Sequence, residues 1–290
     1  MLPVFSSIPS VLDHGSSRVF LRAVDRSKTN VWTDLERADP SDFFTEAEWQ
    51  GIKAHPQPEV RYVLEWVGKQ AACQAINWQG RGGVRLQDIE IWHDIAGAPF
   101  LRASLGASSG HDFSDIALSM SGEGELAIGA AVAFLQTPLA ADRVSEEQIL
   151  GIGIDLVAFE HLGSVPDQIW QIILQHTFTP GEIEESLEGA DRAGQVKILS
   201  AMFAGKEAVF KSFGWLLHQA WLAGFHPGGA AIDFRGIEIL EVHSNQPRVN
   251  LPGGLREVAQ SWRAINFQIK YFFETDVVVA LALGLGSGTA

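Results

Sequence analysis

Cysteine is nearly absent from the chain, which contains one, Cys73, in 290 residues. One cysteine cannot form an intrachain disulfide, so a disulfide-stapled secreted scaffold is excluded and a reducing compartment is expected. Long hydrophobic runs are also missing. The longest, "DVVVALALGLG" at residues 276–286, is shorter than the roughly 20 residues that span a bilayer and predicts a buried strand. The first residues lack the basic start and apolar run of a signal peptide. We therefore expect a cytoplasmic protein with no membrane contact.

Positive charge is scarce as well. The chain has 21 Lys and Arg against 35 Asp and Glu, a net charge of -14. Such a surface does not attract nucleic-acid backbones or anionic membranes, so both partners are excluded. A small phosphate-bearing ligand is still possible, because a metal ion and a few local cations can hold it. Hydrophobic residues make up 46%, enough for a sizeable core in one large or two fused domains.

The chain contains an internal repeat. Residues 43–76 and 177–210 each open with a Phe-Thr pair and a short acidic helix start. Each then carries a helix with a run of small residues, "AACQA" in the first and "AGKEA" in the second. Aligning these runs places Lys206-Glu207 against Cys73-Gln74, and Lys211 against Trp78.

The repeat continues beyond the helices. "LQDIEIWHDIAGAPFL" (86–101) resembles "FRGIEILEVHSNQPRV" (234–249), and each half closes on a strand rich in Ala and Val, at 126–134 and 276–285. We predict an α+β fold of two similar half-units, each with a three-stranded antiparallel sheet plus helices, packed as a pseudo-dimer around a cleft.

The predicted boundaries follow from composition. The N-terminal half spans 1–140 and the C-terminal half 149–290, joined by a polar crossover at 136–148. Residues 149–159 open the second half as a β-branched strand. Residues 214–230 form a helix and a Gly/Pro loop that the first half lacks, a candidate flap.

The stretch "MFAGKEAVFKSFG" (202–214) predicts a helix with two buried faces. At 100° per residue, one arc is apolar and the opposite face is small, so another element can approach closely there. Lys206 projects from the apolar arc, and Glu207 and Lys211 share its edge at i, i+4 spacing. Buried charges need partners. These could be each other, as an ordinary helix pair, or a ligand.

Asp155 in "GIGIDLV" is the second candidate for a functional site residue. An acid that follows an apolar strand is either a strand-end cap or a metal ligand. Asp155 and Glu207 would supply two carboxylates from two elements, the usual protein contribution to Mg²⁺ when phosphates and water complete the shell. Lys211 could then act as a base or stabilise charge. Only the second half carries these charges, so one active site is expected.

Three segments in this order, "GIGIDLV", "FTPGEIE" and "FAGKEAVFKSFG", resemble the 4′-phosphopantetheinyl transferase superfamily. The second half resembles the single-unit holo-acyl carrier protein synthases. The whole, over about 43–285, resembles the double-unit surfactin-type enzymes, particularly the branch associated with polyketide or polyunsaturated fatty acid synthases.

The resemblance implies transfer of the phosphopantetheine arm of coenzyme A to a serine of an acyl or peptidyl carrier protein, giving holo-carrier protein and 3′,5′-ADP. It implies that Asp155 and Glu207 bind Mg²⁺ and that Lys211 is the catalytic lysine of the KEAxxK motif. It also implies coenzyme A contacts from Lys69, Ser119, Ser121 and Lys206. The expected enzyme is a monomer.

The chain departs from the family pattern at three places: Met120 replaces the histidine of an SHS motif, Ala98 a basic residue, and Val157 the second acid of GIDxE. An alternative is therefore a non-catalytic paralogue that binds coenzyme A or a carrier protein. A different Mg²⁺-dependent phosphate-ester enzyme is the third hypothesis. Because carrier proteins of this class are generally acidic, docking needs a basic patch, such as Arg143, Arg192 and Lys197, or an apolar groove.

Overall fold

The computed structural model covers 290 residues. It describes 8–14, 17–25, 39–80, 83–94, 97–103, 115–134, 149–188, 191–222, 234–251, 256–257, 259–260 and 264–286. The chain forms two compact units, Met1–Asp142 and Arg143–Ala290, and each is described by itself. The predicted crossover at 136–148, with Arg143, lies outside the described residues, as do residues 223–230 of the predicted flap.

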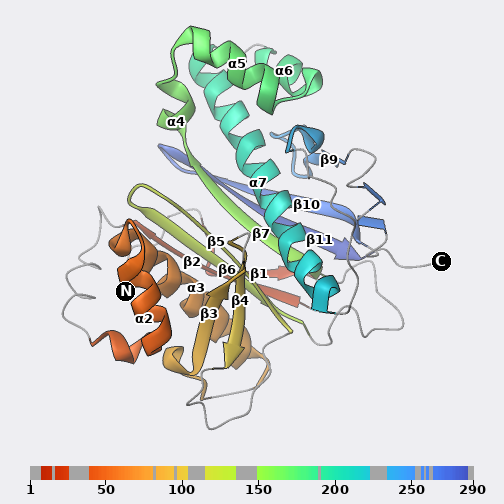
Figure 1. The fold of residues 1–290 in the computed structure, drawn as a ribbon. Coiled ribbons are helices and arrows are strands. Elements are labelled where there is room, and N and C mark those ends of the chain that lie inside the picture. Colours follow the sequence, from red (N-terminus) through yellow and green to blue (C-terminus); the bar gives the residue numbers. More distant parts are fainter. Residues whose placement is uncertain are drawn as a thin grey trace. The chain divides into compact units, whose positions relative to one another are not determined.

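The described residues of unit 1 form a four-stranded antiparallel sheet, a separate hairpin and two helices (Figure 1). The sheet has the order β1-β2-β6-β5. Its strands are β1 (Val11–His14), β2 (Ser17–Asp25), β5 (Ile116–Glu123) and β6 (Leu126–Ala133). The hairpin pairs β3 (Ile89–His93) with β4 (Pro99–Ala103). The helices are α2 (Glu46–Ala54) and α3 (Pro58–Trp78), with single 3₁₀ turns at Pro40–Asp42 and Leu86–Asp88.

The long helix α3 covers one face of the unit 1 sheet, mainly over β6 and β2. The approach is close, because a Cβ on Gly129 of β6 would lie 2.9 Å from the backbone nitrogen of Gly68 in α3. Side chains between helix and sheet form the core, among them Val67, Ala71 and Ala131, all fully buried. Burial of this apolar face stabilises the helix on the sheet.

Unit 2 is built around a three-stranded antiparallel sheet of order β10-β11-β7. Its strands are β7 (Ile149–Ala158), β10 (Ala264–Phe273) and β11 (Val277–Gly286). A separate hairpin pairs β8 (Glu238–Leu240) with β9 (Arg248–Asn250), after a 3₁₀ turn at Phe234–Gly236. The helices are α4 (Phe159–Gly163), α5 (Asp167–Thr177), α6 (Pro180–Leu187) and α7 (Arg192–Leu222). Figure 1 shows α7 running across the sheet, where it packs on β7 and β11.

The α+β class is confirmed, but the predicted strand set was wrong in part. The repeated segments 86–101 and 234–249 add no strand to the main sheets; in both units their strands pair within a separate two-stranded hairpin. The unit 1 sheet has four strands instead of three. The pseudo-dimer stays a prediction. No helix among the described residues is long and apolar enough to cross a bilayer.

The same buried network occurs in both units. In unit 2, Thr179 caps α6, and the Glu182 carboxylate accepts from the Thr179 backbone N–H at 2.8 Å, the Ile239 N–H at 2.7 Å and the Lys206 ammonium at 2.7 Å. In unit 1, Glu48 occupies the same position. It accepts from the backbone N–H of the α2 cap, Thr45, at 2.8 Å, from the Ile91 N–H at 2.7 Å and from Lys69 at 2.6 Å.

This network corrects the alignment of the repeat. Lys69, not Cys73, is the counterpart of Lys206, so "GKQAACQ" matches "GKEAVFK". The alignment made from the small-residue runs was wrong by four residues, which is about one helical turn. In the corrected register Gln70 stands opposite Glu207, and Gln74 opposite Lys211.

The strand register extends the correspondence to the sheets. A Cβ on Gly68 would collide with Met120, and one on Gly205 would collide with Tyr271. Met120 is paired with Gly129, which is paired with Arg22. Tyr271 is paired with Ala280, which is paired with Asp155. Arg22 is therefore the unit 1 counterpart of Asp155.

Candidate active site

Close packing of α7 on β7 positions the predicted acids. A Cβ on Gly153 would collide with the Ala208 carbonyl oxygen and lie 2.7 Å from the Ser212 nitrogen. The small face predicted for this helix is confirmed, since Ala204, Ala208 and Ser212 are fully buried. Asp155 lies two residues after Gly153, on the same face of β7. The strand thus presents its carboxylate directly to α7.

Lys211 is ion-paired with Asp155. Its ammonium donates to Asp155 Oδ1 at 2.6 Å and to the Ile154 carbonyl oxygen at 3.3 Å. The Asp155 side chain is 9% exposed and that of Lys211 30% exposed. The reading of Glu207 and Lys211 as an ordinary helix ion pair is therefore not what the structure shows, because Lys211 pairs across to the strand.

Glu207 lies near both charges. Burial raises the pKa of its carboxyl, the charge of Asp155 raises that pKa further, and Lys211 lowers it. Two carboxylates that repel one another at a half-buried site favour a bound cation. Among the described residues, no group of three or more His, Cys, Asp and Glu side chains could hold a metal ion. Two carboxylates fit Mg²⁺, which usually takes only one or two carboxylates from the protein, keeps several waters and binds substrate phosphates.

The two lysines predicted to contact coenzyme A are placed elsewhere. Lys69 and Lys206 are both 0% exposed and ion-paired with Glu48 and Glu182. Burial lowers the pKa of each lysine and raises the pKa of each glutamate, and each partner's charge opposes these shifts. Neither ammonium reaches solvent, and each forms a buried ion pair within its unit; their predicted contact with coenzyme A stays a prediction. The sequence shows where the two glutamates come from. Each is the last residue of a Thr-x-x-Glu capping box, which starts α2 in unit 1 and α6 in unit 2.

Strand β5 carries the Ser119-Met120-Ser121 motif with its side chains on alternate faces. Met120 is 8% exposed and lies in the core between sheet and α3, against Gly68. Ser119 and Ser121 are also buried, on the opposite face of the strand. Their predicted contact with coenzyme A stays a prediction.

The other two departures from the family pattern, Val157 and Ala98, lie in a hydrophobic core and in a turn. Val157, which replaces a second acid, is 6% exposed and belongs to the unit 2 core. The backbone N–H of Ala98 donates to Asp94 Oδ1 at 2.8 Å and closes the turn between β3 and β4.

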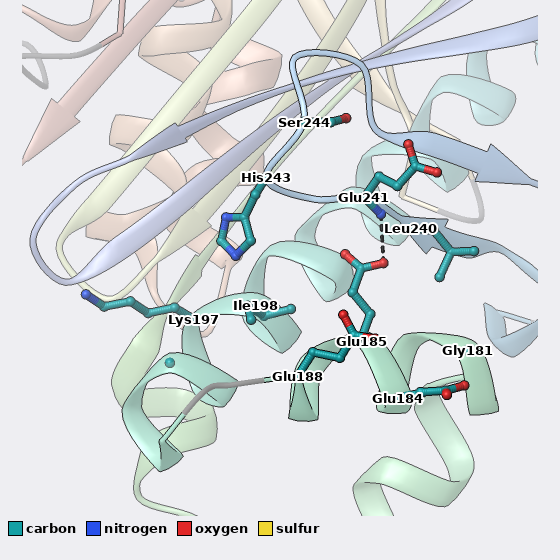
Figure 2. A pocket seen from close by; sticks show the side chains of 11 residues that line it. Gly181, Glu184, Glu185, Glu188, Lys197, Ile198, Leu240, Glu241, His243 and Ser244 are labelled. Carbon is teal, nitrogen blue, oxygen red and sulfur yellow. Dashed lines mark hydrogen bonds between the residues drawn. The ribbon is translucent and has the colours of Figure 1, made fainter.

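Each unit also has a hollow on its hairpin side. The unit 2 hollow encloses about 740 Å³. In Figure 2, Lys197 and His243 lie toward one end of it, and Glu185 accepts from the Glu241 backbone N–H at 2.8 Å. The unit 1 hollow encloses about 390 Å³ and includes Glu65, whose Oε1 accepts from Arg61 and His93. Neither hollow is lined by Asp155, Glu207 or Lys211.

Comparison with known proteins gives the family. The model of the 4′-phosphopantetheinyl transferase superfamily matches residues 151–282. A holo-(acyl-carrier-protein) synthase of Thermodesulfovibrio yellowstonii is 31% identical over 105 residues, covering 36% of this chain and 79% of that protein. One from Desulforudis audaxviator is 29% identical over 138 residues, covering 48% of this chain and 94% of that protein.

The chain belongs to the 4′-phosphopantetheinyl transferase superfamily. The matched segment lies within unit 2, a shorter range than the expected 43–285, and it contains Asp155, Glu207 and Lys211. Among solved structures, the holo-ACP synthase of Plasmodium yoelii aligns at 24% identity with a TM-score of 0.38, covering 49% of this chain and 98% of that one. The acyl carrier protein synthase of Mycobacterium tuberculosis aligns at 25% identity with a TM-score of 0.34, covering 48% and 100%.

Proposed function

We propose that this phosphopantetheinyl transferase moves the 4′-phosphopantetheine arm of coenzyme A to a serine of an acyl or peptidyl carrier protein, with Mg²⁺ bound by Asp155 and Glu207. One observation carries the proposal. Two acidic side chains from different elements lie close enough for the charge of one to raise the pKa of the other, beside a single partly exposed lysine.

The corrected repeat adds support. Both units keep the Lys-Glu network, so that feature serves the fold. What differs is the trio itself: Asp155, Glu207 and Lys211 in unit 2 stand where unit 1 has Arg22, Gln70 and Gln74. A site that can hold a divalent cation is therefore possible in unit 2 and not at the matching place in unit 1.

In the proposed reaction, the serine oxygen forms a bond to the β-phosphorus of coenzyme A. The bond from that phosphorus to the oxygen of 3′,5′-ADP breaks, and the hydroxyl proton is released. A bound Mg²⁺ would supply charge neutralisation on the pyrophosphate. Asp155 is fixed by β7 and Glu207 by α7, so the two carboxylates are held in place before substrate arrives.

Lys211 has the remaining role. Its amine nitrogen lies 2.6 Å from Asp155 Oδ1, beside the proposed metal position, and its side chain is 30% exposed, so we assign it stabilisation of phosphate charge. Lys69 and Lys206 are left out of the proposed substrate contacts because they are buried. Ser119 and Ser121 remain in the proposal as contacts from unit 1, and the expected form is a monomer.

The test is an intact-mass measurement. The protein, Mg²⁺, coenzyme A and a panel of apo-carrier proteins are incubated, and a carrier that is modified gains about 340 Da, the mass of the arm. Glu207→Gln and Asp155→Asn should each lower the rate at least about 100-fold. The matched control is Glu184→Gln, an exposed acid of α6 in the same unit, which should retain the wild-type rate.

A second candidate, a binding paralogue without transfer, is favoured by the burial of Met120, which leaves no hydrogen-bond donor where the family has histidine. Calorimetry separates the two. Mg²⁺-dependent coenzyme A binding with a mass shift supports the enzyme. Binding with no mass shift on any carrier supports the paralogue and contradicts the proposed transfer.

A further inference from the structure

Lys211 lies where a cation is expected to bind. Its ammonium is 2.6 Å from Asp155 Oδ1. An Mg²⁺ ion bound to that same oxygen at about 2.1 Å would be less than about 5 Å from the ammonium. Two cations at that separation in a partly buried site repel one another strongly. The ion pair and a metal ion therefore compete for Asp155.

The two partners of this ion pair differ in freedom. Asp155 is held in the middle of β7 by its register with Ala280. Lys211 is a long, flexible side chain of α7 that is 30% exposed. Lys206 shows the contrast: it is fully buried and donates to both Glu182 and the Thr177 carbonyl oxygen. Of the two lysines, only Lys211 can leave its partner without opening the core.

We infer that Lys211 is the counter-ion of Asp155 in the metal-free enzyme and moves from Asp155 to a phosphate group of the substrate when the metal binds. The inference rests on the proposed function. It makes the metal and the phosphate ligand cooperative, because a pyrophosphate gives the displaced ammonium a new partner. The metal alone must displace Lys211 with nothing in exchange.

The experiment measures metal binding, not turnover. Free Mn²⁺, a spectroscopic stand-in for Mg²⁺, is counted by electron paramagnetic resonance with wild type, Lys211→Gln and Lys211→Met. Glutamine is the conservative choice, since Gln74 occupies the matching position in unit 1. Lys197→Met is the control, because it removes a lysine of the same helix that is ion-paired with neither acid.

Loss of the competing cation should tighten Mn²⁺ binding roughly tenfold in both Lys211 variants, and Lys197→Met should stay within about twofold. The gain should persist in 0.5 M KCl, because a direct contact is screened far less than a distant charge. Inorganic pyrophosphate should tighten Mn²⁺ binding more in wild type than in the variants.

Equal or weaker Mn²⁺ binding in both Lys211 variants overturns the inference. A gain of the same size in Lys197→Met, or one that vanishes in salt, overturns it too, since general charge would explain the result. The proposed function fails separately: it does so if wild type binds no Mn²⁺ with or without pyrophosphate and modifies no carrier. Wild-type transfer without a Lys211 effect on Mn²⁺ contradicts this inference alone.

Discussion

The close packing of α7 on β7 gives the sharpest test of how the site is built. Gly153→Ala adds one methyl group where no space exists: it would overlap the Ala208 carbonyl and lie 2.7 Å from the Ser212 nitrogen. Normal contact for such atoms is about 3.5 Å, so the Ser212 contact alone requires the helix to retreat by roughly 1 Å, and the overlap with the Ala208 carbonyl requires more. Both obstacles are backbone atoms of α7, so no side chain can rotate away. Overpacking that side chains can relieve costs about 1 to 3 kcal/mol; a backbone overlap that nothing can relieve exceeds that range, so we expect about 3 to 5 kcal/mol.

That cost is a large share of a typical stability of about 5 to 15 kcal/mol. With a urea slope of roughly 2 kcal/mol/M, the unfolding midpoint of unit 2 should fall by about 2 M. Where the variant is still folded, the shift of α7 also separates Glu207 from Asp155, so Mn²⁺ binding should weaken. The control is Gly284→Ala in the same sheet, where the added Cβ meets the Phe267 ring at 3.4 Å and the Gly151 backbone at 3.7 Å, both ordinary contact distances. A Gly153→Ala protein that unfolds with wild type would refute the reasoning.

Two further predictions concern buried polar groups. Lys206→Met leaves the Glu182 carboxylate without its cation and should destabilise unit 2 by about 3 to 5 kcal/mol, and Lys69→Met should cost unit 1 the same. Urea unfolding measures both losses, with Lys197→Met as the control. A loss under about 1 kcal/mol would contradict the assigned structural role. Tyr271→Phe should stabilise by about 1 kcal/mol at pH 8, because the buried Tyr271 hydroxyl has no hydrogen-bond partner among the described residues. Burial first, and the charges of Glu182 and Glu185 second, raise the pKa of Tyr271 above its usual 10. Below pH 10 the tyrosine is neutral in both the folded and the unfolded chain. Above pH 10 it ionises in the unfolded chain but stays neutral in the folded one, which destabilises the wild type, so the advantage of Tyr271→Phe should widen. Thermal melts at pH 8 and 11 check this, and an unchanged difference would contradict it.

Periodicity and turn chemistry were enough to predict the elements that carry the site. The small face of "AGKEAVFKS" predicts close approach of a second element, and β7 is that element. The strand at 149–159 was expected and lies at Ile149–Ala158. The α+β class follows from the same patterns. These features are local, so the spacing of residue types determines them.

The strand partners could not be predicted in the same way. The sequence shows that 89–91 and 237–239 are strands of similar composition, but not that each pairs only with the next strand along the chain. Sheet membership depends on contacts between distant segments. For the same reason, two strands of the main sheets were not predicted from the sequence. They are β2, inside the unit 1 sheet, and β10, at the edge of the unit 2 sheet.

The misplaced lysines have a physical explanation. A lysine in an apolar helix indicates either a ligand contact or a buried ion pair, and the choice depends on whether a carboxylate reaches it from elsewhere. Glu182 does so from a helix cap 24 residues earlier in the chain. The cap itself was readable from Thr179 and Glu182, but its second use, as partner of Lys206, requires the three-dimensional structure.

How the two halves are aligned determines which residues differ between them, and so which residues are assigned to function. Aligning "AACQA" with "AGKEA" made Lys206 part of the difference between the halves and gave Lys69 no counterpart in the second half. The matching networks move the alignment by one turn, so Lys69 and Lys206 become equivalent and the difference reduces to three positions. At each of them unit 1 changes the charge: Arg22 for Asp155, Gln70 for Glu207 and Gln74 for Lys211. The buried ion pair is present in both units, so it serves stability, whereas the two acids are present only in unit 2, where the proposed chemistry takes place.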